Sequence, residues 1–116
     1  MDFELARLDW RVNDLVSTLG KHRFAGSGYD IAPMEGFLAG YAPEFPLTSD
    51  ELALLSDAWQ LYRLRAAVQY WNSYFQTDGP TSRLRSALQA IDQAAWIADH
   101  PEAIARLRRT ALEAAA

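Results

Sequence analysis

The sequence predicts an all-α domain of about five helices, and three observations lead to that prediction. The chain has 116 residues and half of them are hydrophobic, which is enough for one domain with one core. Apolar residues recur at helical spacing through most of the second half, and residues that start or stop helices stand between those stretches. We therefore expect one helical domain over 1–116, with short helices and loops in 1–46 and a three-helix tail in 47–116.

The strongest local signal is the segment LTSDEL. Thr48 can cap a helix while Glu51, three residues later, reaches back to the cap amide, which makes a capping box. Leu47 and Leu52 stand at the positions of a hydrophobic staple. Because no Pro or Gly follows for many residues, this helix is expected to extend to about Gln76.

Apolar residues surround most of this predicted long helix. One side carries Leu52, Leu55, Trp59, Tyr62, Ala66, Tyr70 and Tyr74, and the remainder carries Leu54, Leu61, Leu64, Val68, Trp71 and Phe75. A helix that is apolar most of the way round is typical of a central position with neighbours on several sides.

Two shorter helices are expected after it. Apolar residues at spacings of four and three predict an amphipathic helix over about 81–98. Pro101 suits the first turn of a last helix that continues to the alanine-rich end.

The first 46 residues are less regular. A short helix is expected over 12–19, a polar glycine-containing loop over 21–30, and a second helix over 31–41 with Pro33 in its first turn. The segment 42–46 contains two prolines and is expected to be an extended connector.

Composition excludes several function classes. The chain contains no cysteine, so disulfides and thiolate zinc sites are excluded. His22 and His100 lack ligand spacing and are interpreted as surface or helix-end residues. The net charge is −4, and the one basic cluster, Arg106 to Arg109, is interpreted as a helix end, so nucleic acid is not an expected partner.

No segment of the sequence predicts membrane insertion or secretion. No apolar run approaches the ~18 residues that cross a bilayer, and the acidic start differs from a secretory signal. We therefore expect a cytoplasmic protein with no membrane contact.

Two acidic residues near the start form the one candidate metal site. If residues 1–5 are extended, Asp2 and Glu4 point to one face and Phe3 to the other. Two carboxylates on one face suit Mg²⁺, although two acids near a terminus are more often simply solvated.

A longer pattern resembles a known family. Three motifs follow one another along the chain, and they are DFE-x-A-R-x-x-x-R-V-x-D-L, F-L-x-G-Y and P-L-T-x-x-E-L. In this order they resemble the C-terminal part of the aminoglycoside phosphotransferase, choline kinase and homoserine kinase family, which has a protein-kinase-like fold. The likeness covers residues 2–64.

The resemblance implies roles for three acids. Asp2 would hold Mg²⁺ against nucleotide phosphates, Glu4 would be an accessory acid beside it, and Asp14 would brace the catalytic loop as a partly buried anchor. The family's catalytic loop, nucleotide lobe and phosphate-binding lysine have no counterpart in this chain, so there are no catalytic residues to assign.

The resemblance therefore implies a fragment. The chain would be the C-terminal part of an ATP-dependent phosphotransferase acting on a small hydroxyl-bearing molecule, inactive alone and binding neither Mg²⁺ nor ATP tightly. The alternative is a non-enzymatic helical module that self-associates or binds a partner. In both cases we expect residues 1–20 and the long helix to expose an apolar face, which a homodimer or a partner such as an upstream kinase half would cover.

The aromatic residues of the long helix have two interpretations. In the family, these aromatic side chains would lie on the side of the acceptor substrate, where aromatic faces suit a quaternary ammonium group. They are Trp59, Tyr62, Tyr70, Trp71 and Tyr74. Acidic residues would suit a polyamine-like acceptor instead; they are Glu35, Glu44, Asp50 and Asp57. The simpler interpretation, that these aromatics form the core, is favoured.

Overall fold

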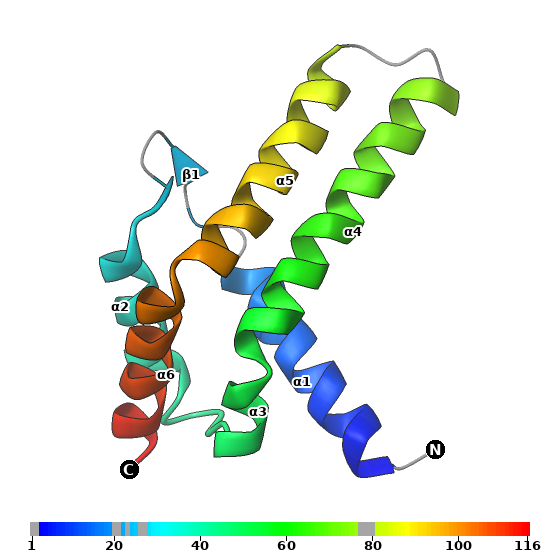
Figure 1. The fold of residues 1–116 in the computed structure, drawn as a ribbon. Helices are drawn as coiled ribbons and strands as arrows, with labels where there is room; N and C mark the ends of the chain where they lie inside the picture. Colours follow the sequence, from blue (N-terminus) through cyan, green and yellow to red (C-terminus); the bar gives the residue numbers. More distant parts are fainter. Residues whose placement is uncertain (1–2, 20–21, 23, 26–27, 77–80) are drawn as a thin grey trace.

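The computed structural model describes the backbone of residues 3–19, 22, 24–25, 28–76 and 81–116. This part of the chain forms six α-helices and one small β-hairpin (Figure 1). The all-α prediction is confirmed. The elements are α1 (Phe3–Leu19), β1 (Phe24–Ala25), β2 (Gly28–Tyr29), α2 (Ile31–Tyr41), α3 (Ser49–Ala53), α4 (Leu55–Gln76), α5 (Ser82–Asp99) and α6 (Pro101–Ala115).

The hydrophobic core lies at one end of the molecule, where α1, α2, α3 and α6 surround the start of α4 and the end of α5. Along α4 the fully buried core extends only to Trp59, and along α5 it begins at Ile97. Figure 1 shows the remaining parts of α4 and α5 extending beyond this body as an antiparallel pair. We call this part, residues 61–76 and 81–94, the arm.

Small residues hold the two helices of the arm together. Ala67 of α4 and Ala87, Ala90 and Ala94 of α5 are buried, and α4 and α5 pack against each other more extensively than any other two elements. Alanines allow close approach of helix axes, but they bury little apolar area. The arm is therefore the least well covered part of the described fold.

The capping box is confirmed. Thr48 N donates to Glu51 Oε1 at 2.9 Å, and Glu51 N donates to Thr48 Oγ1 at 3.1 Å. The carboxylate of Glu51 is buried, and its Oε2 lies 3.0 Å from Arg11 Nε. Arg11 also donates from Nη2 to the carbonyl oxygen of Pro46 at 2.6 Å, so it joins α1 to the start of α3.

The predicted long helix is interrupted once. It forms α3 and α4, with Leu54 between them, where the Leu54 amide donates to the carbonyl oxygen of Glu51 three residues back. This i→i+3 bond tightens the last turn of α3 and changes the direction of the chain. The interruption raises the number of helices from the expected five to six.

The first helix is longer than expected. It begins at Phe3 rather than near Val12, and no Pro or Gly stands between these residues to stop it. The extended conformation assumed for residues 1–5 is therefore wrong from Phe3 onward.

The basic cluster falls in the middle of α6 and not at a helix end, which corrects that interpretation. Arg106 forms an ion pair with Glu35 of α2, and Thr110 Oγ1 donates to Glu35 Oε2 at 2.9 Å. The Arg106 and Thr110 contacts lower the pKa of Glu35. Helices α2 and α6 are thus joined by polar contacts as well as by apolar packing.

The segment expected to be a loop contains the β-hairpin. Phe24 pairs with Tyr29 and Ala25 with Gly28 in an antiparallel ladder. Each strand has only two residues, which is too short for an alternating pattern to be recognised in the sequence. The hairpin lies beside α5 and brings Tyr29 into the core (Figure 1).

Candidate functional site

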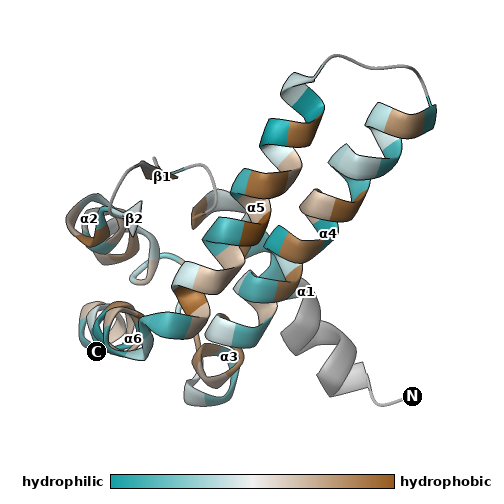
Figure 2. Cartoon of the chain, turned by 45° about the horizontal axis from the view of Figure 1, so that its top comes forward, coloured by the Kyte–Doolittle hydropathy of each residue, from teal (hydrophilic) through white to brown (hydrophobic). Residues whose placement is uncertain are grey.

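The arm carries an exposed apolar stripe. Large apolar side chains on α4 and α5 are about half exposed: Leu61 55%, Leu64 45%, Val68 58%, Trp71 50%, Phe75 60%, Leu88 60% and Ile91 47%. Figure 2 shows hydrophobic residues recurring along both helices. Single exposed apolar residues are ordinary, but a contiguous set of this kind indicates an interaction surface.

The spacing along α4 is that of a coiled-coil seam. Residues 61, 64, 68, 71 and 75 follow at alternating intervals of three and four, which is the a/d pattern of a heptad repeat. The rings of Trp71 and Phe75 are 5.0 Å apart, so the end of the stripe is continuous.

The stripes of α4 and α5 lie on the same side of the arm. Successive residues of an α-helix are about 100° apart around the helix axis. On each helix, the stripe lies about 100° around the axis from the residues that face the other helix, and the sense of this rotation is the same on both helices. Because the helices are antiparallel, rotations in the same sense about each axis turn both stripes to one side. We call this surface the arm face, defined by Leu61, Leu64, Val68, Trp71, Phe75, Leu88 and Ile91.

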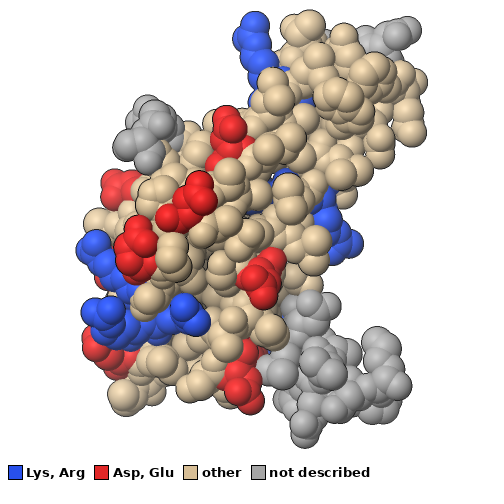
Figure 3. All heavy atoms as spheres, viewed as in Figure 1, with Lys and Arg blue, Asp and Glu red and all other residues tan. Residues whose placement is uncertain are grey.

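Charged residues flank the arm face and do not interrupt it. Arg65 lies at its outer edge on α4, and Asp92 at its outer edge on α5; both side chains are exposed. Arg63 contacts Gln93 across the two helices, so Arg65 and Asp92 lie at nearly the same level along the arm. Figure 3 shows one side of the molecule, where charged side chains are sparse on the arm and gathered on the body.

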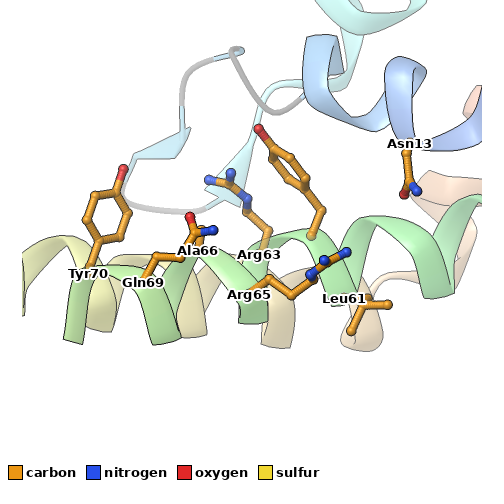
Figure 4. A pocket seen from close by; sticks show the side chains of 8 residues that line it. Asn13, Leu61, Arg63, Arg65, Ala66, Gln69 and Tyr70 are labelled. Carbon is orange, nitrogen blue, oxygen red and sulfur yellow. The ribbon is translucent and has the colours of Figure 1, made fainter. Parts of the chain in front are cut away.

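A second feature is a groove on another side of α4, with a volume of about 430 Å³ (Figure 4). We call it the α4 groove. The described residues that line it are Asn13 from α1 and, from α4, Leu61, Tyr62, Arg63, Arg65, Ala66, Gln69 and Tyr70. Figure 4 shows the side chains of Arg63, Gln69 and Tyr70 extending from the same side of α4, while Arg65 extends along the helix toward Leu61.

Arg63 is held in place by neutral groups. Its Nη1 donates to Gln93 Oε1 at 3.0 Å, and its guanidinium carbon lies 4.5 Å from the centre of the Tyr62 ring. Its Nε is buried and has no hydrogen-bond partner. Among the described residues, the ion pairs are Arg11–Glu51 and Arg106–Glu35, so no described carboxylate neutralises Arg63.

Behind Arg63 lies an aromatic cluster. The Tyr29 ring is 4.9 Å from that of Trp59 and 5.3 Å from that of Trp96. The Tyr29 hydroxyl and the Trp59 indole nitrogen are buried without a well-formed hydrogen bond, although the indole is close enough to lower the pKa of the phenol. Gly28 has φ 120°, and a Cβ there would clash with the Trp96 indole.

We expect the folded protein to lose stability at strongly alkaline pH. Burial raises the pKa of Tyr29 from 10.0 to about 12, against the opposing effect of Arg63. The folded state holds this proton more tightly than the unfolded state. The contribution of Tyr29 to the free energy of unfolding is therefore fully present below about pH 10 and is lost as the pH rises through about 12, which lowers the free energy of unfolding by roughly 2–3 kcal/mol. Urea unfolding measured across this pH range would show the loss.

The control for this prediction is Tyr29→Phe, which removes the ionising group and keeps the ring. Its unfolding free energy should depend less steeply on pH than that of the unchanged chain. Equal pH dependence in both proteins would contradict the prediction.

The predicted metal acids are not brought together by any described contact. Asp2 lies outside the described residues, and for Glu4 only the backbone is described, as part of α1. Their assignment as magnesium ligands stays a prediction. Asp14 is exposed on α1, so the expected partly buried position is wrong, and its role beside a catalytic loop stays a prediction.

The candidate substrate-side aromatics separate into three places. Trp59 is fully buried in the core, which agrees with the favoured interpretation. Tyr62 and Tyr70 line the α4 groove. Trp71 lies on the arm face, and the Tyr74 ring contacts Phe75. One surface therefore does not unite all five.

His100 lies at the junction of α5 and α6, as expected for a helix-end residue. Its Nδ1 is 2.7 Å from the carbonyl oxygen of Trp96, and its ring stacks on the Trp96 indole at 4.2 Å. Within the described ranges, no group of three or more His, Cys, Asp or Glu side chains is arranged to hold a metal ion. The described helices also include none that is both long and apolar enough to span a bilayer.

Comparisons of the chain with protein-family models, curated proteins and solved structures find no match. The resemblance to the phosphotransferase family therefore stays a prediction.

Sequence reasoning expected an exposed apolar face on the long helix, but it did not extend that face to Leu88 and Ile91 of α5, and it missed the α4 groove. The stripe residues had been identified as apolar, and their alternation of three and four is a seam signal readable from the sequence. Arg63 had no comparable signal, because its neutral surroundings come from Gln93 and Tyr62 after folding.

Proposed function

We propose that the chain is a non-enzymatic helical module that pairs with a second copy of itself through the arm face. The observation that carries this proposal is the exposed apolar stripe with seam spacing on an arm that projects from the core. Two such helical hairpins, packed face to face, make a four-helix bundle in which each stripe is covered by the other.

The flanking charges favour a second copy in one arrangement. If the two-fold axis runs parallel to the helices, α4 of one chain lies against α5 of the other. Arg65 then stands beside Asp92 of the second copy, at nearly the same level, and symmetry repeats the pair. If the axis runs across the helices instead, α4 lies against its own copy and the two Arg65 side chains approach each other. Charge complementarity therefore favours the parallel axis.

A charge exchange tests the proposal. Arg65→Glu or Asp92→Arg alone should weaken pairing by about tenfold, because each places like charges together at two symmetric positions. The double variant should restore most of the affinity. Sedimentation equilibrium over the micromolar range would measure the dissociation constants.

The matched control is Arg109→Glu, which makes the same charge change on α6, away from the arm. It should leave pairing unchanged. An unchanged chain that stays monomeric throughout this range would contradict the proposal and leave a different chain, such as an upstream kinase half, as the occupant. Failure of the double variant to recover would contradict the parallel axis.

A further inference from the structure

The α4 groove is positively charged in a chain that is acidic overall. Among the described residues, Arg63 and Arg65 contribute to its lining and no Asp or Glu does, whereas the whole chain has a net charge of −4. The other polar lining groups are the amides of Asn13 and Gln69 and the hydroxyls of two tyrosines. A groove of this composition attracts anions and offers them hydrogen-bond donors.

Arg63 is oriented but not neutralised. Gln93, which is only 7% exposed, holds Nη1, and the Tyr62 ring supports the guanidinium plane. The buried groups behind it, Tyr29 and Trp59, are neutral, and neither the hydroxyl nor the indole nitrogen makes a well-formed hydrogen bond. A fixed guanidinium among neutral groups binds a carboxylate or phosphate more strongly than a mobile surface arginine does.

The groove also suits an organic body. Tyr62 and Tyr70 both line it, with Arg63 between them in sequence and on the same side of α4 as Tyr70 in Figure 4. Its volume of about 430 Å³ lies within the range of roughly 300–1,000 Å³ that small-molecule sites occupy. Aromatic walls beside one charged anchor select a flat molecule that carries an acidic group.

We propose that the α4 groove binds a small aromatic anion, with its carboxylate or phosphate group on Arg63 and its ring against Tyr62 and Tyr70. Arg65 lies at the rim and adds long-range attraction. Arg63, the anchor of the site, faces away from the arm face, whereas Leu61 and Arg65 line the groove and also belong to the arm face or its edge.

The test uses four probe molecules followed by NMR. Phenyl phosphate and benzoate should shift the Arg63 Nε–H signal and the Tyr62 and Tyr70 ring signals. Inorganic phosphate alone should bind several-fold more weakly, and neutral phenol should bind more weakly still. The ratio of phenyl phosphate to benzoate affinity tells which acidic group the groove prefers.

Arg63→Gln should lower the affinity for phenyl phosphate at least tenfold, while Arg83→Gln, an exposed change on α5, should leave it unchanged. If Arg63→Gln does not fold, Arg63→Lys serves instead. This variant keeps the positive charge but removes the planar guanidinium, so its affinity for phenyl phosphate should still fall. Equal binding of phenol, equal binding by the Arg63 variant, or shifts confined to other regions would overturn the proposal.

Discussion

Aspartate in place of Val68 (V68D) is expected to dissociate the pair, with an increase in Kd on the order of 100-fold or more. Val68 is 58% exposed in the single chain and lies at the middle of the arm face. In the pair, two copies of the new carboxylate would be enclosed by leucine and aromatic side chains, and the cation nearest to each, Arg65 one turn away on the same helix, is already paired with Asp92 of the other copy in the proposed arrangement. Burying an unpaired charge is among the largest single costs in protein association.

The same change should hardly affect the folding of one chain, because the side chain at this position is open to water there. Sedimentation equilibrium would report the dissociation, and urea unfolding of the dilute chain would report the folding. Gln89→Asp is the matched control: it adds the same charge to an exposed position of the arm outside the stripe, and pairing should persist. A V68D chain that pairs as tightly as the unchanged chain would contradict the assignment of this face.

The elements that the sequence predicted well are those governed by local contacts. The capping box at Thr48 needs only residues within one turn, and both of its hydrogen bonds are present. Pro101 at the start of α6 is equally local. The break at Leu54 was not predicted, because the segment remains apolar through it and the sequence shows no Gly or Pro there.

Periodicity showed which faces of the long helix are apolar, but it could not show which of them have neighbours. Trp59 and Trp71 are both apolar positions of one helix, yet one is fully buried and the other half exposed. The difference arises because the core ends near Trp59, beyond which α4 has mainly α5 beside it. Whether a stripe is core or interface depends on the extent of the rest of the fold.

The surroundings of Arg63 depend on still longer-range contacts. Gln93 approaches from another helix, and Tyr29 comes from a two-residue strand that the sequence did not indicate. Gly28 is needed there because the backbone has positive φ and passes directly against Trp96. None of these neighbours could be assigned to Arg63 from spacing along the chain.

The two tryptophans of α4 should respond to alanine in opposite ways. In the V68D background, where folding is separated from pairing, Trp59→Ala should lower the free energy of unfolding by about 3–5 kcal/mol. The Trp59 side chain is completely buried, and its ring supports that of Tyr29 at 4.9 Å, so its removal leaves a cavity at the junction of the hairpin and α4. This is a large share of the ~5–15 kcal/mol that stabilises a typical domain.

Trp71→Ala in the same background should change the free energy of unfolding by less than about 1 kcal/mol, because the ring is half exposed and the aromatic ring beside it, Phe75, is itself exposed. With Val68 restored, Trp71→Ala should instead weaken pairing, since large aromatic side chains buried in an interface contribute a large share of its binding energy. Urea unfolding followed by circular dichroism measures the first effect, and sedimentation equilibrium the second. A loss of folding stability from Trp71→Ala as large as that from Trp59→Ala would mean that this side of α4 is covered within one chain, and the arm face would then not be available to a second copy.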